Sequence, residues 1–149
     1  MAVKPIPEGY HTVTPYLVVE GVPKLMEFVK AAFDAREIHR TAMPDGSVMH
    51  AEVQIGDSRV MMGEARGGMK PIPAMLYVYV PDVDAVYERA VHAGGTSIAK
   101  PMEQFYGDRS GGVQDACGNQ WWIGTHTEDV PAGELARRAE AAMKQRSQG

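Results

Sequence analysis

The chain has 149 residues, of which 44% are hydrophobic and 23% charged, and its net charge is −4. This is the composition of a globular protein rather than a disordered one, and without a basic run it gives no support to nucleic acid as a partner. No apolar run approaches the ~20 residues of a membrane helix, so we expect no membrane partner. With no signal-peptide pattern and a single cysteine, Cys117, we expect a cytoplasmic location.

The first half of the chain predicts a strand, a helix and three further strands. Residues 12–19 have β-branched and aromatic side chains, and residues 22–34 place apolar side chains at helical spacing. Residues 37–43 predict the next strand, and Gly56-Asp57 marks a hairpin turn between strands at 48–55 and 59–64. Strict alternation along the first hairpin strand puts His50 and Glu52 on the same face, opposite its apolar residues.

The second half predicts the same series. After a glycine- and proline-rich linker, we expect a strand at 74–80, a helix capped by Asp82 and ended by Gly94-Gly95, and a short strand at 96–99. A loop over 101–108 leads to a hairpin of strands at 109–115 and 119–125. Residues 133–146 are rich in Ala, Glu, Arg and Lys, which predicts a mostly exposed terminal helix.

The repetition is visible in the letters. Tyr16-Leu-Val-Val-Glu-Gly-Val22 returns 61 residues later as Tyr77-Val-Tyr-Val-Pro-Asp-Val83, and the glycine-ended runs at 51–56 and 113–118 are offset by 62. We therefore predict one α+β domain of two βαβββ modules, at about residues 10–66 and 74–130, with a helical tail at 131–149. An alternating strand needs one covered and one open face, so a curved mixed sheet should surround a central cup.

With this duplicated unit the chain resembles the vicinal oxygen chelate superfamily of glyoxalases, bleomycin resistance proteins and extradiol dioxygenases, and more narrowly its PhnB-like, glyoxalase-related members. The segments that carry the resemblance are His50-Ala-Glu-Val-Gln-Ile-Gly-Asp57, Tyr106-Gly-Asp-Arg109, Asp115-Ala-Cys-Gly-Asn-Gln-Trp121 and Thr125-His-Thr-Glu-Asp-Val130. The resemblance spans about residues 10–131. The resemblance implies the fold. It does not by itself imply an activity, because this fold hosts many unrelated chemistries.

In metal-using relatives the ligands stand on the first and last strands of each module. The resemblance carries these positions to Thr14 and Met75 on the first strands, and to Val60 (or Met62) and Trp122 on the last. None offers an imidazole, carboxylate or thiolate donor, so we expect no metal cofactor. The alternative is a divalent metal on relocated ligands, namely His50, Glu52, Glu64 and His126. In that alternative Glu64 and His126 are symmetry mates at an offset of 62; otherwise they cap or bridge loops at strand ends.

Trp121 and Trp122 are adjacent and should face opposite ways, Trp121 into the core and Trp122 into the cup. Arg109 could bind an anionic ligand or form an internal ion pair. His50, with Glu52, is the candidate catalytic base; a purely structural hydrogen bond is the other interpretation. The candidate ligand-binding residues are Tyr16, Met62, Met75, Tyr77, Tyr106, Arg109 and Trp122. The cup is either an apolar, aromatic pocket or a space filled by its own side chains.

Three functions remain open, each on a homodimer. The first is a glyoxalase-related protein that binds a small apolar or aromatic molecule without the usual metal ligands, by sequestration or with metal-free acid–base chemistry. The second is a metal-dependent lyase, isomerase or dioxygenase with relocated ligands. The third is a non-catalytic scaffold or regulatory protein.

Overall fold

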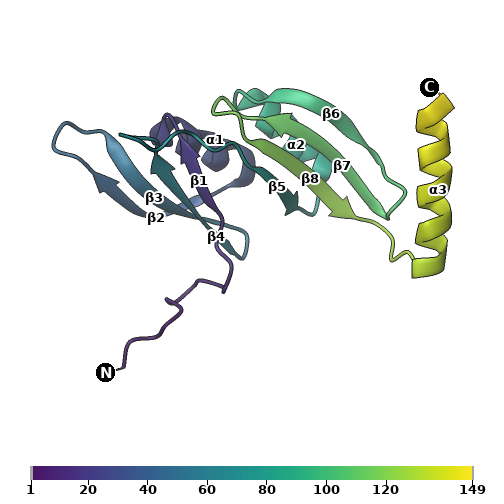
Figure 1. The fold of residues 1–149 in the computed structure, drawn as a ribbon, viewed down its shortest axis with the longest axis horizontal. Coiled ribbons are helices and arrows are strands. Elements are labelled where there is room, and N and C mark those ends of the chain that lie inside the picture. Colours follow the sequence, from purple (N-terminus) through teal and green to yellow (C-terminus); the bar gives the residue numbers. More distant parts are fainter. Residues whose placement is uncertain (1, 149) are drawn as a thin grey trace.

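The structure, a computed structural model, describes residues 2–148. Module 1 comprises β1 (Tyr16–Val19), α1 (Val22–Phe33), β2 (Arg36–Ala42), β3 (Val48–Ile55) and β4 (Ser58–Glu64); module 2 comprises β5 (Met75–Tyr79), α2 (Val83–His92), β6 (Thr96–Glu103), β7 (Asp108–Gln114) and β8 (Gln120–His126); and α3 (Ala132–Gln148) follows. The predicted pair of βαβββ modules is confirmed (Figure 1).

Each module is a four-stranded mixed sheet, ordered β1-β4-β3-β2 in the first and β5-β8-β7-β6 in the second. The outer pairs β1–β4 and β5–β8 are parallel, while the hairpin pairs are antiparallel. Within residues 2–148 no strand of one sheet pairs with a strand of the other. The curved surface expected around one cup is therefore divided between two open sheets, each with one face that no helix covers.

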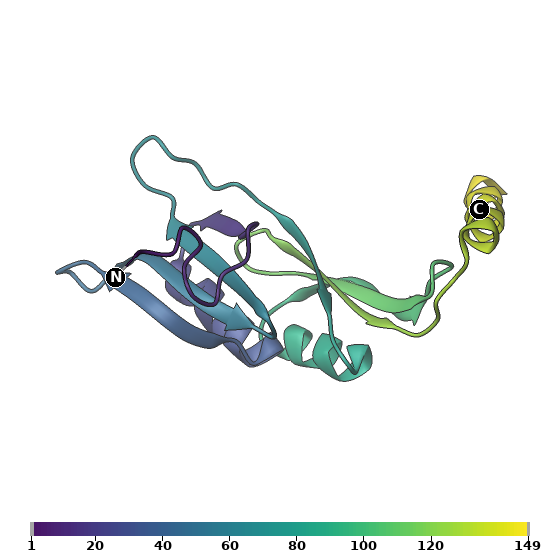
Figure 2. The ribbon, with the colours of Figure 1, turned by 90° about the horizontal axis from the view of Figure 1, so that it is seen from below.

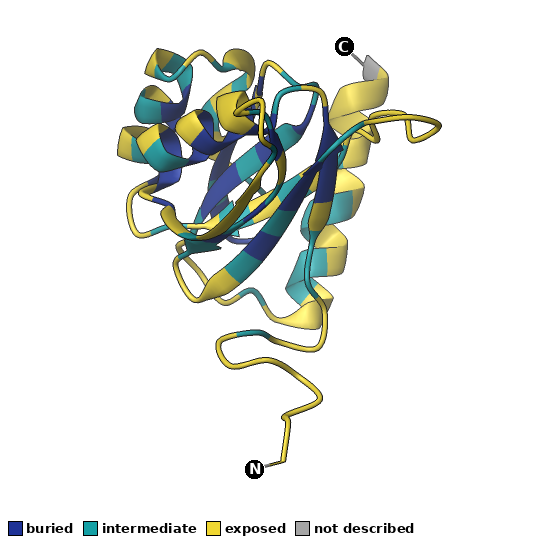
Figure 3. Cartoon of the chain, turned by 90° about the vertical axis from the view of Figure 1, so that its left-hand side faces the viewer, coloured by how far each residue is buried: buried dark blue, intermediate teal, exposed yellow. Residues whose placement is uncertain are grey.

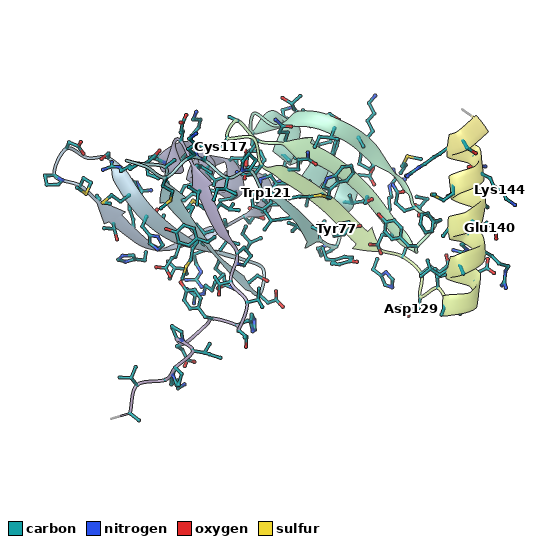
Figure 4. All side chains as sticks on the ribbon, viewed as in Figure 1. Tyr77, Cys117, Trp121, Asp129, Glu140 and Lys144 are labelled. Carbon is teal, nitrogen blue, oxygen red and sulfur yellow. The ribbon has the colours of Figure 1, made fainter. Side chains whose placement is uncertain are left out.

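The core lies where the two helices meet the covered faces of the sheets. α1 and α2 pack on one another, and the ring of Trp121, on β8, lies 5.1 Å from the ring of Phe33 and 6.2 Å from that of Phe28, both on α1. Trp121 is fully buried, as predicted, and stands at the junction of the modules (Figure 4). The buried residues lie on the strands and on the inward sides of α1 and α2, whereas α3 is exposed or half-buried (Figure 3).

A buried carboxylate supports the last turn of module 2. Asp115 is 4% exposed and accepts hydrogen bonds from the Trp121 indole nitrogen (2.8 Å), the backbone N–H of Cys117 (2.8 Å) and that of Asn119 (3.0 Å). The Asn119 amide oxygen in turn accepts from the backbone N–H of Ala74, just before β5. The motif Asp115–Trp121, which supported the family resemblance, is therefore a structural element that seats Trp121 in the core.

Backbone N–H groups at the N-termini of α1 and α2 donate hydrogen bonds to side chains on the last strand of each sheet. Glu64, at the end of β4, accepts from the backbone N–H groups of Gly21 and Val22, where a carboxylate also complements the helix dipole. At the corresponding place in module 2, the Thr125 hydroxyl accepts from the backbone N–H of Val83. The two modules thus begin their helices with the same device built from different residues.

Two strand predictions need correction. β1 begins at Tyr16 rather than residue 12, and just before it the Pro15 oxygen accepts a hydrogen bond from the backbone N–H of Met61 on β4. β6 runs on to Glu103 through a stretch predicted as loop. It is an edge strand with register shifts, and such a strand accommodates Pro101 without losing a ladder hydrogen bond.

The ends of the chain extend away from the modules. Figure 2 shows α3 beyond the far end of module 2, where Arg138 binds Glu128 and the backbone oxygen of Phe105. Residues 2–9 are exposed. Over the described part of the chain, no helix combines the length and the apolar character that crossing a bilayer requires.

Candidate functional site

On the first and last strands, the open faces of the two sheets correspond at an offset of 61, and on β3 and β7 the offset is 60. Tyr16 on β1 is the register partner of Met61, and Tyr77 on β5 is the register partner of Trp122. Trp122 therefore lies on the open face, as predicted, and its counterpart is Met61. Met75 and Tyr77 lie on the same face of module 2 and are 66% and 39% exposed.

The offset corrects two assignments. Val60 and Met62 were predicted to face the cup, yet they are 3% and 0% exposed and belong to the core under α1. The error arose because the turns were aligned at 62 residues, and a one-residue slip moves a strand side chain to the opposite face. Met61 occupies the open-face position instead.

A buried carboxylate is the centre of the open face of module 2. Asp108 is 2% exposed and accepts hydrogen bonds from the hydroxyls of Tyr77 (2.8 Å) and Tyr79 (3.0 Å) and from Nδ1 of His126 (2.8 Å). Burial by itself raises the pKa of Asp108, but these hydrogen bonds outweigh it and hold the pKa below the usual range. Burial and the bond to Asp108 raise the pKa of Tyr77, so this tyrosine stays protonated and remains a hydrogen-bond donor.

His126 lies between two acids at the end of β8. Its Nδ1 contacts Asp108, and its Nε2 lies 2.7 Å from the carboxylate of Asp129, in the segment that leads to α3. The bond to Asp108, followed by that to Asp129, raises the pKa of His126 above its ordinary value. In the protonated form both ring nitrogens donate, so the imidazolium links the sheet to the C-terminal segment.

Aromatic side chains surround this polar centre. The rings of Tyr77 and Tyr79 lie 5.0 Å apart, and the Tyr106 hydroxyl reaches Ser110 at 3.4 Å. Trp122 lies flat over Gly112, where an added Cβ would come within 3.0 Å of the indole ring. The open face of module 2 is therefore an exposed aromatic surface over a buried charge.

The open face of module 1 carries a different constellation. The Tyr16 hydroxyl lies 3.3 Å from Nδ1 of His50, and Nε2 of His50 lies 3.2 Å from the Glu52 carboxylate. Glu52 thus orients the imidazole, a contact that residue spacing alone left open. Burial, with a smaller contribution from the charge of His39, lowers the pKa of His50, so the neutral base predominates at neutral pH.

Arg109 takes no part in either open face. Its guanidinium donates two 2.9 Å hydrogen bonds to Asp84, at the start of α2, and lies 3.6 Å from Glu103. By strand alternation it points to the helix side, opposite Asp108. Of the two alternatives weighed from the sequence, the structure shows the internal ion pair.

The four residues considered as an alternative metal site do not lie close together. Glu64 caps α1 on the helix side of sheet 1, whereas His50 and Glu52 lie on its open face, and His126 belongs to the other module. The register pairs Glu64 with Thr125, not His126, as symmetry mates. Among the residues that the structure describes, no three His, Cys, Asp or Glu side chains are grouped so as to hold a metal ion.

A cleft of about 890 Å³ separates the modules along β5. Its walls come from the β3–β4 turn on one side and from β5 and the start of α2 on the other. The apolar residues that line it include Phe33, Ile55, Val60, Leu76, Val78 and Trp121. The outer edge of β5, which has no strand partner in residues 2–148, runs along this cleft.

Sequence reasoning missed Asp108, Tyr79, Ser110 and Met61 as open-face residues. A signal for Asp108 was present, since it precedes Arg109 on a strand and so must face the other way. The sequence did not predict that three donors converge on this carboxylate, because the donors come from β5 and β8, which are distant from Asp108 in the sequence.

Residues 10–123 match the sequence profile of the Glyoxalase/Bleomycin resistance protein/Dioxygenase superfamily. This chain belongs to that superfamily. The resemblance seen in the sequence is thereby confirmed. An uncharacterized protein of Mycobacterium bovis is 34% identical over 147 residues, covering 91% of this chain and 94% of that protein, and one of Mycobacterium tuberculosis is equally identical, with 84% of its length covered.

Solved structures share the fold of this superfamily member. TioX from Micromonospora sp. ML1 is 22% identical, with a TM-score of 0.67 over 78% of this chain and 98% of that one. A PhnB protein from Bacillus cereus, described as a putative 3-demethylubiquinone-9 3-methyltransferase, is 16% identical, with a TM-score of 0.63 over 77% and 99% of the chains. At these identities the likeness is one of fold.

Proposed function

We propose that this superfamily member binds a small, flat, apolar or aromatic molecule on its open sheet faces, without the metal ligands of the enzymatic relatives. The observation that carries the proposal is the exposed aromatic surface of module 2. Tyr77, Tyr79 and Trp122 present stacking area, and Asp108 fixes the tyrosine hydroxyls from beneath. Exposed apolar surface of this kind marks binding sites in soluble proteins, and aromatic rings stack favourably on flat ligands.

The proposal includes a homodimer in the cytoplasm, in which the open face of one chain is covered by the other. Two features support the dimer: the unpaired outer edge of β5, and the 66% exposed Met75 beside it. An exposed strand edge next to apolar side chains favours association. Sedimentation velocity measures the oligomeric state, and Met75→Lys is expected to weaken the dimer. Met143→Lys is the matched control, because Met143 is equally exposed but lies on α3.

Tryptophan fluorescence tests ligand binding, with 2-naphthamide as a neutral aromatic probe. We expect the probe to quench Trp122 emission in the wild type, and Trp122→Phe to remove the response, since the remaining Trp121 is buried. Gly112→Ala should weaken binding, because the added Cβ displaces the Trp122 ring. Wild-type emission that stays unchanged up to millimolar probe would contradict the proposal.

A second candidate, metal-free acid–base chemistry on the bound molecule, rests on the Tyr16–His50–Glu52 chain of contacts. Glu52 accepts from Nε2–H, which leaves Nδ1 as the basic atom facing the Tyr16 hydroxyl. In this arrangement the Tyr16 oxygen can take a proton from a ligand while the Tyr16 hydroxyl proton moves to Nδ1 of His50, and Glu52 stabilises the resulting imidazolium. Exchange of an acidic C–H proton of a bound probe, followed by NMR in D₂O, should slow in His50→Gln. An unchanged exchange rate would remove this candidate.

A further inference from the structure

Arg59 is a shielded cation without an acidic partner. It lies on β4 and is only partly exposed, yet within residues 2–148 it makes no side-chain hydrogen bond or ion pair. Its Nε is buried and lacks a hydrogen-bond partner. The other partly buried arginines behave differently: Arg89 binds Asp34, Arg109 binds Asp84, and Arg138 binds Glu128. An arginine that lacks such a partner in a shielded position is uncommon, because a charge leaves water at a cost unless it is paired.

The N-terminal segment builds the wall around this guanidinium. Arg59 Cζ lies 5.2 Å from the centroid of the Tyr10 ring, in a cation–π contact. Gly9 adopts φ 85°, and a Cβ at this position would collide with the guanidinium, so the backbone lies directly against it. His11 holds the segment to the backbone oxygen of Asp57, in the β3–β4 turn. The Tyr10 hydroxyl, also buried, has no hydrogen-bond partner among the described residues.

Alternation along β4 places Arg59 on the open face of module 1. Val60 and Met62 are buried against α1, so Arg59, Met61 and Gly63 project from the opposite side. Two residues along a strand are about 7 Å apart, so a ring lying over Met61 would bring a substituent to Arg59. Arg36 is exposed and shares this row, since both arginines are register partners of Gln54. This end of the open face is therefore cationic.

The geometry points to Arg59 as the anchor for an anionic group, most simply a carboxylate, on the ligand. The guanidinium fork matches the two oxygens of such a group. The wall of Gly9 and Tyr10 narrows the approach, which favours a small anionic group over a broad protein surface. This inference rests on the proposed function and adds the ligand class and the face to it: an aromatic acid, with its ring over Met61 on the open face of module 1 and its carboxylate at Arg59.

Paired probes test the inference by calorimetry, with 2-naphthoate as the acid and 2-naphthamide as its neutral match. We expect Arg59→Gln to weaken naphthoate binding by about 10-fold to 100-fold, the range for a charge-assisted hydrogen bond, and to change naphthamide binding by less than about threefold. Arg59→Lys keeps the charge without the fork and should fall between. Arg146→Gln removes an exposed charge on α3 and should leave both affinities unchanged. Thermal unfolding confirms that each variant is folded.

The failures can be told apart. If the wild type binds both probes equally and Arg59→Gln alters neither, the inference is wrong and the proposed function stands. If neither naphthyl probe binds, the proposed function fails, and the arginine is tested by acetate alone through the ¹⁵N–¹H signal of its Nε. A signal that moves with saturation supports anion binding, and one that stays fixed overturns it. If Arg59→Gln weakens the dimer but not naphthoate binding, the arginine serves the interface and the inference is also wrong.

Discussion

The two modules share strand order and the parallel pairing of the first and last strands, while their open faces differ in chemistry. In module 1 the tyrosine of the first strand meets His50 and Glu52 on β3. In module 2 the matching tyrosine, Tyr77, meets the buried carboxylate of Asp108 on β7, and a glycine replaces the counterpart of Glu52 so that Trp122 can lie flat. The framework is fixed by the covered faces, which must build one core. The open faces carry no such constraint, so they could diverge into a polar and an aromatic surface.

The largest expected difference between the modules is in how much a hairpin-turn aspartate contributes to the free energy of unfolding. Asp115→Ala should lower the free energy of unfolding by about 3 kcal/mol or more, because the Trp121 indole and two backbone N–H groups lose their acceptor inside the protein. Asp57→Ala, in the exposed turn of module 1, should stay within about 0.5 kcal/mol. Urea unfolding measures both. Equal losses would show that the Asp115 network does not stabilise module 2.

Tyr16 and Tyr77, which occupy matching positions on the first strand of each module, should differ less in their contribution to the free energy of unfolding. Tyr77→Phe removes a donor from a buried, ionised carboxylate and should cost about 2 kcal/mol, whereas Tyr16→Phe removes a 3.3 Å contact to a neutral imidazole and should cost about 0.5–1 kcal/mol. Chemical unfolding of the two variants at neutral pH provides the comparison. A Tyr16 variant as unstable as the Tyr77 variant would mean that the open faces contribute alike.

The smallest effect is a pH dependence that differs in sign between the modules. The folded-state pKa of His126 is raised, so its stabilising contribution is complete below the unfolded value of about 6.5 and is lost as pH rises through the folded pKa. The folded-state pKa of His50 is lowered, so its contribution is present above about 6.5 and is lost as pH falls through the folded pKa. Unfolding free energies measured from pH 5 to 9 should therefore shift in opposite directions in His126→Gln and His50→Gln.

Parallel pH profiles for these two variants would contradict the assigned environments. The matched substitution controls for loss of the ring itself, because glutamine keeps hydrogen-bonding capacity but does not titrate in this range. The comparison is made as a difference from the wild type at each pH, so that carboxylates common to all three proteins cancel.

Periodicity and turn residues were sufficient to predict the two βαβββ modules, but not their division into two open sheets. The sequence placed both helices and the duplicated hairpins because each strand and helix is amphipathic, and that pattern is local. Trp121 and Trp122 were also assigned to the correct faces. The open-face sites were harder, because a contact such as Tyr79 to Asp108 joins β5 to β7 across an intervening strand. The misplaced Val60 and Met62 show how one residue of alignment error inverts a face.

The linker between the modules also closes an edge of the first sheet. Ile72, just before β5, donates its backbone N–H to the oxygen of Val18 on β1. A chain cut at the exposed Gly67-Gly68 turn would leave this pairing segment on the second fragment, although it completes the first. The two fragments should therefore recognise one another through backbone pairing as well as through Trp121, and mixing them should restore a folded complex that neither forms alone.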